Sequence, residues 1–376
     1  MDSAANGSKA LVIPIDLWQY HAAINIPNLI LIFMSILLEA MPFIVLGAII
    51  AGLLEELVPQ KLITRLLPRS RFLSIAIGGL LGLIFPMCEC GIIPVMRRLL
   101  RKGLPVSCCT AYLLAGPIIN VVVMLSTFMA FQGKEGTPVL PGMAPQMGGW
   151  WMMGLRMGLG YLVAIGTSLI VDWQYRKYGN KLLTPLATPS SLPLLDEDAP
   201  ERRRSLWERM TNIVQTSLHD FVDIMVFLIL GGLIAALTRQ LVPQNAVAAW
   251  SKDFPYLAIL IMMGLAVVLC LCSEADAFVA ASYATMRPAA KLAFLVLGPM
   301  LDFKLYFMYT RVFRPRLIYT IFLSVIVQTF VYAMVVHVIW DGMDVRVPYT
   351  NVEIRIPGYG ADLQPVPPPK DTAPTT

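Results

Sequence analysis

The chain has 376 residues, of which 57% are hydrophobic and 14% charged, with a formal net charge of +5 at pH 7. Soluble globular domains carry about 25% charged residues, so this composition excludes a water-soluble protein. Unbroken apolar runs of about 20 residues exclude the alternating strands of a transmembrane barrel, and the lack of a dense basic patch excludes nucleic acid as a partner. We therefore predict an all-α polytopic integral membrane protein with the lipid bilayer as its partner.

The apolar segments form two groups along the chain. In the first group we expect a span, an interrupted segment and two further spans, at Leu29 to Val58, Phe72 to Leu100, Pro105 to Phe131 and Trp150 to Val171. The second group repeats this order, at Phe221 to Leu237, Pro255 to Met286, Ala289 to Thr310 and Leu317 to Trp340. We divide the chain into an N-terminal interfacial segment (1–28), a first transmembrane repeat (29–171), a cytoplasmic polar linker (172–216), a second repeat (217–340) and an extracytoplasmic Pro-rich tail (341–376).

The two groups are copies of one unit. The segment from Glu39, EAMPFIVLGAIIAGLLEELVPQ, aligns without a gap to the segment from Asp223, DIMVFLILGGLIAALTRQLVPQ. After a slip of two positions, Cys88 and Cys90 align with Cys270 and Cys272, and the first Gly-Pro pair aligns with the second. Such internal duplication is typical of transporter folds.

The interrupted segment of the first unit is too short to cross the bilayer before its proline. The stretch from Phe72 to Phe85 gives roughly 21 Å of helix, less than the hydrocarbon thickness. Basic residues flank the segment on both sides, which places both flanks in the cytoplasm by the positive-inside rule: Lys61, Arg65, Arg69 and Arg71, then Arg97, Arg98, Arg101 and Lys102. We therefore expect three transmembrane helices plus a re-entrant hairpin per unit, and hence inverted repeats; the alternative is eight or more full spans with parallel halves.

Thiols and carboxylates gather at both interruptions. The first reads Cys88-Glu89-Cys90, and the second reads Cys270-Leu271-Cys272-Ser273-Glu274-Ala275-Asp276. Thiolates favour Cu(I), Zn(II) and similar ions, and ionisable residues inside a membrane are functional by default. We expect a substrate or ion site formed by these residues: Cys88, Glu89, Cys90, Cys272, Ser273, Glu274 and Asp276, with Cys88, Cys90 and Cys272 as the metal-binding thiols. The alternative is that the cysteines are small buried apolar residues, as we expect for Cys108 and Cys109.

Gly-Pro pairs break one later span in each unit. They are Gly116-Pro117 and Gly298-Pro299, and each frees backbone polar atoms inside the membrane. Asn120 and Asp302 follow at equivalent positions, so we expect both to face a central cavity and bind substrate or ions. The alternative is a structural kink that neighbouring helices satisfy.

Other charged residues are candidates for proton coupling. Glu39 and Asp223 occupy equivalent positions in the first span of each unit, where exposure to lipid is costly, so we expect both to face the bundle interior. Lys304 is either the counter-ion of Asp302 or a residue that reaches the cytoplasmic interface. We interpret Arg156 and His337 as interfacial anchors near span ends.

The sequence shows no chemistry of an enzyme. It has no phosphate-binding GxxxxGK[ST] loop, and its three histidines lie far apart, so we predict no enzymatic activity and no cofactor beyond a transported cation. Energy for transport must come from an ion gradient, a partner or the gradient of the substrate itself.

Four segments resemble one family: FPMCECGIIPVMRRLLRKGLP, AYLLAGPIINVVV, LCSEADAFVAAS and LVLGPMLDFK. They look like the bacterial predicted-permease family that includes the methylarsenite efflux permeases, and the resemblance runs from about Leu29 to Trp340. It implies a multi-pass inner-membrane transporter, with members linked to export of organoarsenicals and, in one branch, of copper or zinc. The family cysteines fall on Cys88, Cys90 and Cys272, and the exact motifs are most similar to a poorly characterised subgroup.

From the residues and the resemblance together, we predict efflux of a thiophilic metal or organometalloid species by alternating access, with carboxylates that carry protons in exchange. The alternative is a membrane subunit of a larger permease complex that scaffolds or gates a second subunit.

Overall fold

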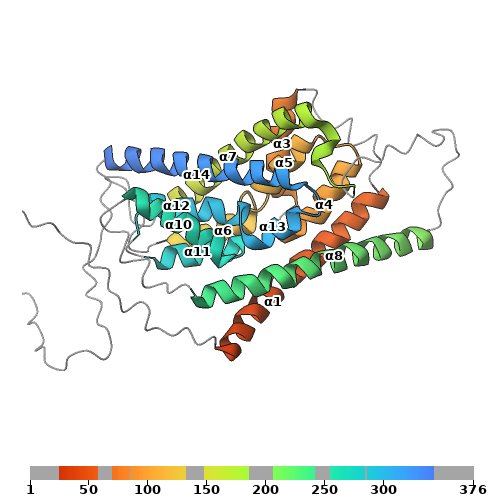
Figure 1. The fold of residues 1–376 in the computed structure, drawn as a ribbon, viewed down its shortest axis with the longest axis horizontal. Helices are drawn as coiled ribbons and strands as arrows, with labels where there is room; N and C mark the ends of the chain where they lie inside the picture. The colour runs from red at the N-terminus through yellow and green to blue at the C-terminus, as the bar shows by residue number, and fades with distance from the viewer. Residues whose placement is uncertain are drawn as a thin grey trace, which may run out of the picture.

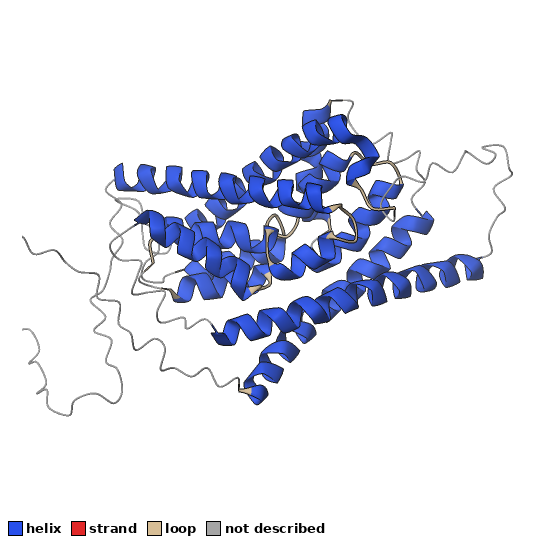
Figure 2. Ribbon diagram, viewed as in Figure 1, coloured by secondary structure: helices blue, strands red, loops and turns tan. Residues whose placement is uncertain are grey.

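The computed structural model describes residues 25–57, 70–85, 87–132, 148–185, 206–241, 255–283 and 286–342. Over these residues the chain is α-helical with short 3-10 turns, and its β-type pairing is a single bridge between Leu183 and Phe313 (Figure 2). The prediction of an all-α protein is confirmed. The two tails, 1–24 and 343–376, lie outside the described residues, as do residues 186–205 of the predicted linker.

The helices follow the predicted order of spans and interruptions. The first unit contains α1 (Ile26–Leu57), α3 (Arg71–Ile84), α4 (Glu89–Arg101), α5 (Val106–Ala115), α6 (Val121–Phe131), α7 (Gly148–Tyr178) and η3 (Gly179–Leu182). The second contains α8 (Leu206–Leu241), α10 (Pro255–Leu269), α11 (Ser273–Ser282), α12 (Pro288–Leu297), η4 (Gly298–Met300), α13 (Phe303–Tyr309) and α14 (Pro315–Gly342). In order along the chain, α1, α3, α4, α5, α6 and α7 correspond to α8, α10, α11, α12, α13 and α14.

Five described helical stretches are long and apolar enough to cross a membrane: Ile26–Leu53, Gly148–Leu182, Met210–Leu237, Pro288–Tyr309 and Pro315–Asp341. The helices α5 and α6, joined by a short turn, together match the length of a further crossing. Many large apolar side chains on these helices are exposed, as lipid contact requires. The chain is therefore a multi-pass protein of the cell membrane.

Equivalent helices of the two units run in opposite directions. At one end of the α1–α8 pair, Gln240 Nε2 at the end of α8 donates to the carbonyl of Asn25 at the start of α1, at 2.9 Å. In the α7–α14 pair, Arg316 near the start of α14 donates to the hydroxyl of Tyr178 at the end of α7, at 2.7 Å. Figure 1 shows both pairs antiparallel. This inversion of the halves is the arrangement that the sequence predicted.

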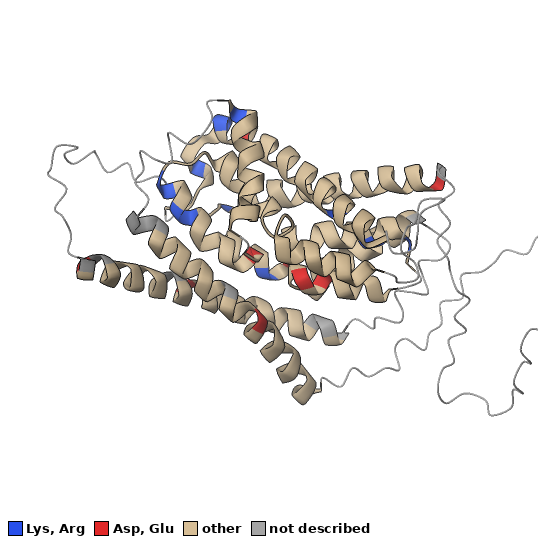
Figure 3. Cartoon of the chain, turned by 180° about the vertical axis from the view of Figure 1, so that it is seen from behind, with Lys and Arg blue, Asp and Glu red and all other residues tan. Residues whose placement is uncertain are grey.

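The two interruptions approach the middle of the bundle from opposite ends. In Figure 1, α3, α4 and α5 lie at one end of the molecule, and α10, α11 and α12 lie at the other. In Figure 3, most of the ribbon coloured for Lys and Arg lies at the end that holds α4, whereas the ribbon coloured for Asp and Glu is found both near the middle of the bundle and at helix ends. By the positive-inside rule, we expect the α4 end to face the cytoplasm.

One helix begins earlier than the hydropathy pattern indicated. The expected span starts at Phe221, but α8 starts at Leu206, so part of the segment assigned to the linker is helical. The acidic Glu208 lies in its first turn, where the helix dipole favours negative charge. Likewise α7 and η3 continue to Leu182, beyond the predicted end at Val171.

Candidate functional site

The two interruptions meet at a pair of cysteines. Cys88 is the N-cap of α4 and Cys272 is the N-cap of α11, both with extended backbone. One ligand atom each from Cys88, Glu89 and Cys272 lies within 4.8 Å of the other two, and all three residues are buried. We call this group the thiol–carboxylate site. The extended breaks turn the chain back so that the start of each new helix presents its first side chains to the other half.

The cysteines pair differently from the sequence alignment. That alignment placed Cys88 opposite Cys270, but the two N-caps are Cys88 and Cys272, so the ungapped register of Glu39 and Asp223 extends as far as these cysteines. Cys270 has a positive φ of 47°, and its thiol lies 3.2 Å from the carbonyl of Val267. Neither Cys270 nor the buried Cys90 belongs to the group of three ligand atoms.

A buried ion pair joins this site to the second half. Lys304 Nζ donates to Glu89 Oε1 at 2.9 Å and lies 3.7 Å from Asp302 Oδ2. The residue is 3% exposed, so it does not reach the interface. Glu89, rather than the neighbouring Asp302, is its closer partner. The other oxygen of Glu89, Oε2, is buried and has no hydrogen-bond partner among the described residues.

Asn120 and Asp302 hold equivalent positions, as predicted, and both cap a restarted helix. Asn120 is the N-cap of α6 and accepts a hydrogen bond from the backbone N–H of Val122 at 3.0 Å. Asp302 is the N-cap of α13 and accepts from Leu305 N–H at 2.5 Å. Each Gly-Pro break leaves helix N–H groups without partners in the bundle, and these side chains satisfy one of them. Asn120 and Asp302 therefore have a structural role as helix caps.

The glycines at the breaks permit close approach. A Cβ at Gly298 would lie 2.6 Å from Asp276 Oδ2, and a Cβ at Gly116 would lie 2.7 Å from a methyl of Ile92. Asp276 is 1% exposed, and its Oδ2 has no hydrogen-bond partner among the described residues. The second break therefore brings a buried carboxylate against the backbone of Gly298, where a side chain would displace it.

The remaining residues of the second motif differ in burial. The oxygens of Glu39 and Glu274 lie within 4.8 Å of each other and of Cys272 Sγ. Glu274 is half-buried, and Ser273 is buried with its hydroxyl unpaired among the described residues. Glu39 is exposed, which contradicts the prediction that it faces the interior. It lies on the side of α1 that borders Cys272, so it flanks the buried site without being enclosed.

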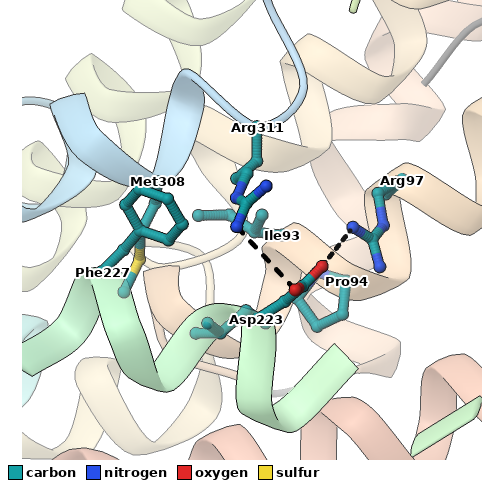
Figure 4. A pocket seen from close by; sticks show the side chains of 8 residues that line it. Ile93, Pro94, Arg97, Asp223, Phe227, Met308 and Arg311 are labelled. Carbon is teal, nitrogen blue, oxygen red and sulfur yellow. Dashed lines mark hydrogen bonds and ion pairs between the residues drawn. The ribbon is translucent and has the colours of Figure 1, made fainter. Parts of the chain in front are cut away.

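Asp223, the equivalent of Glu39, is held by cations. Its Oδ2 lies 3.4 Å from Arg97 of α4, and its Oδ1 lies 3.8 Å from Arg311, which follows α13 (Figure 4). His219 lies one turn away at 3.9 Å. The side chain of Asp223 is 24% exposed and borders a small cavity between α4, α8 and α13. The carboxylate therefore links α8 to α4 and to the turn that follows α13.

The sequence prediction missed the role of Arg156. We expected an interfacial anchor, but Arg156 is 1% exposed and donates to Thr127 Oγ1 at 2.7 Å and to the Ser273 carbonyl at 2.9 Å. It thereby ties α7 to α6 and to the first residue of α11. The signal was present, because an arginine within an otherwise apolar span normally faces the bundle interior. The neighbouring Trp150 and Trp151 gave more weight to an interfacial position than the structure supports.

Comparisons with known proteins agree with this architecture. Residues 25–338 match the family described as "Predicted permease". The UPF0718 protein YcgR of Bacillus subtilis (strain 168) is 34% identical over 79% of this chain and 92% of its own length. A Streptococcus mutans protein named "Putative two-component membrane permease complex subunit" is 31% identical over 79% of this chain and 91% of its own. No solved structure matches the chain. The matched region spans both inverted halves and the thiol–carboxylate site between them, and the chain belongs to the predicted-permease family.

Proposed function

We propose that this permease exports a thiophilic metal or metalloid species, and that the thiol–carboxylate site binds it. The observation that carries the proposal is the convergence of ligand atoms from Cys88, Glu89 and Cys272 within 4.8 Å in a buried position. Two sulfur atoms suit soft ions, and one carboxylate oxygen adds a harder donor. The positive ends of the α4 and α11 dipoles face this position, which favours negatively charged donor groups there.

Alternating access suits this position because the site lies where two inverted halves meet. Its ligands come from α4 and from the N-cap of α11, so a rocking movement of one half against the other opens the site to one side and then to the other. Carboxylates that take up protons as the substrate leaves complete the proposed cycle. Glu39 is the candidate for such exchange, because one of its oxygens lies within 4.8 Å of Cys272 Sγ and of a Glu274 oxygen.

The test compares cysteines inside and outside the site. Cys88→Ser together with Cys272→Ser removes both thiols, whereas Cys108→Ser together with Cys109→Ser removes two buried free thiols that belong to no ligand group. In a deletion strain profiled for tolerance to metals and trivalent arsenicals, we expect the first double variant to lose the tolerance that the wild-type gene restores. We expect the second to retain it. Full tolerance and full efflux with the first double variant would reject the proposed site.

A second candidate function is that of one subunit in a larger permease complex. The name of the Streptococcus mutans relative favours it, because that name describes a subunit of a two-component membrane permease complex. Purification of the tagged chain from its native membrane tests this function. A stoichiometric membrane partner, together with a lack of efflux by vesicles that contain the isolated chain, would support the complex. Efflux by the isolated chain would support a self-sufficient permease.

A further inference from the structure

The ammonium of Lys304 already occupies a cation position beside the thiol–carboxylate site. It is buried between Glu89 of the first half and Asp302 of the second, 2.9 Å and 3.7 Å from their oxygens. A charge at this depth is costly unless it is paired, so both carboxylates contribute to holding it. The ammonium group thus has the carboxylate contacts that a free cation would have at this position, although it is part of the protein chain.

The two carboxylate oxygens of Glu89 have different surroundings. Its Oε1 accepts the hydrogen bond from Lys304, whereas its Oε2 is buried without a partner among the described residues. Glu89 also offers one of the three ligand atoms of the thiol–carboxylate site. The carboxylate of Glu89 would therefore contact both an ion on that site and the ammonium of Lys304. Like charges this close repel strongly in a buried environment.

Resting on the proposed function, we propose that the substrate is a divalent thiophilic cation and that Lys304 is its built-in competitor for Glu89. A neutral trivalent arsenical binds through sulfur alone, gains nothing from the charge of Glu89 and is not repelled by Lys304. A divalent ion such as Zn²⁺ or Cd²⁺ is attracted by Glu89 and opposed by Lys304. The buried Glu89–Lys304 pair thus discriminates substrates by charge and keeps the affinity low enough for release.

Asp302 gives Lys304 a second place to bind. Its Oδ2 lies 3.7 Å from the ammonium, and among the described residues this oxygen accepts no hydrogen bond. As the ion occupies Glu89, Lys304 moves toward Asp302, and as Lys304 returns, the ion leaves. Asp302 caps α13 and Lys304 lies in its first turn, so movement of the second half against α4 changes the balance between the two carboxylates.

The decisive variant is Lys304→Met in the full chain, purified in detergent. Cd²⁺ serves as the divalent probe and phenylarsine oxide as the neutral one, both in equilibrium binding. We expect the Kd for Cd²⁺ to fall about tenfold or more, because a like charge is removed. The Kd for phenylarsine oxide stays within about twofold, as expected for a neutral ligand. Lys291→Met, at another buried lysine, changes neither. Weaker or unchanged Cd²⁺ binding to Lys304→Met would overturn the proposal, because a lysine that only positions Glu89 supports binding.

A second variant keeps the test valid if Lys304→Met does not fold. Asp302→Asn retains a side chain that caps a helix, as Asn120 does at the equivalent position. This substitution removes the second carboxylate partner of Lys304, so that the ammonium pairs with Glu89 alone. We therefore expect Cd²⁺ binding to weaken about tenfold while phenylarsine oxide binding is unchanged. Unchanged Cd²⁺ binding would reject the competition.

Cys88→Ser separates this inference from the proposed function. If it alters the binding of neither probe, the thiol–carboxylate site itself is rejected. If Cys88→Ser weakens Cd²⁺ binding but Lys304→Met does not tighten Cd²⁺ binding, the thiol–carboxylate site is supported and only the proposed role of Lys304 is rejected.

Discussion

Two equivalent helix pairs among the contacts between the halves differ in their chemistry. The start of α4 packs against α13, and the start of α11 packs against α6. The first contact contains the buried Glu89–Lys304 ion pair. At the equivalent positions the second contact has Ser273 and Val122, and Val122 is 47% exposed. Inverted backbones therefore do not imply a symmetric charge distribution.

The packing of α1 and α8 also differs between the two contacts. The glycines Gly47 and Gly231 occupy equivalent positions, but a Cβ at Gly47 would lie 2.5 Å from the carbonyl oxygen of Gly91 in α4, and one at Gly231 would lie 2.8 Å from Cα of Lys304 in α13. Both first helices thus cover the same α4–α13 contact. The α11–α6 contact is supported from α7 instead, through Arg156. The Glu89–Lys304 pair therefore lies in the contact that both first helices cover.

Glu89→Ala should produce the largest loss of stability. It leaves the ammonium of Lys304 without its nearest partner, and breaking a buried ion pair in this way costs about 3–5 kcal/mol. Ser273→Ala, at the equivalent position, removes a buried hydroxyl that has no partner among the described residues and should cost at most about 1 kcal/mol. Thermal unfolding in detergent measures both, and equal losses would contradict the difference between the two contacts.

Arg156→Met should be the next most costly change. It removes the donors to Ser273 and Thr127 from a buried position, for a cost of about 2–4 kcal/mol. The matched control is Arg176→Met, near the end of the same helix, where an exposed arginine pairs with Asp172 one turn away. The control should change stability by less than about 0.5 kcal/mol. If the two variants unfold at the same temperature, Arg156 is not the support of the α11–α6 contact.

A smaller effect is expected at the two equivalent carboxylates of α1 and α8. Asp223→Asn weakens the links to Arg97 and Arg311, and because Asp223 is partly exposed the cost should be about 1 kcal/mol. Glu39→Gln, at an exposed carboxylate, should change the free energy of unfolding by less than about 0.5 kcal/mol. Chemical denaturation of the two variants in parallel provides the measurement. A larger loss for Glu39→Gln would show that the exposed residue is the more important of the pair.

Reporter fusions test the inversion without any expected change in stability. Fusions at Arg71 and Lys102 flank the first interrupted segment, and we expect both reporters on the cytoplasmic side. Reporters on opposite sides of the membrane would mean that α3 and α4 together form a full crossing, and would favour the alternative with eight or more spans.

The order and direction of the helices could be predicted from the sequence because they depend on local signals. Runs of apolar residues mark the spans, Pro86 and the Gly-Pro pairs mark the breaks, and the basic flanks indicate orientation. The candidate site was also predicted in part, since thiols beside carboxylates at matched breaks are an unusual combination. Cys88, Glu89 and Cys272 indeed lie together.

The pairings of the charged residues could not be predicted, because they depend on contacts between distant parts of the chain. Lys304 and Glu89 are 215 positions apart, so sequence proximity favoured Asp302 as the partner. The register of the cysteines was misassigned for a different reason. Helix α4 follows its N-cap Cys88 and α11 follows its N-cap Cys272, but the alignment matched the first cysteines of the two motifs rather than these N-caps.

The pairing of Cys88 with Cys272 also bears on how such a chain could arise. Equivalent residues touch each other only on the axis that relates the two halves. A dimer of one unit, with its two copies inserted into the membrane in opposite orientations, would therefore bring two copies of one cysteine together. Such a dimer would already possess the pair of thiols. Gene fusion would then free each copy to diverge, and an asymmetric feature such as Glu89 opposite Lys304 could appear on one side alone. The sulfur ligands of the site are therefore compatible with an origin before duplication, whereas its charge asymmetry requires two distinct halves.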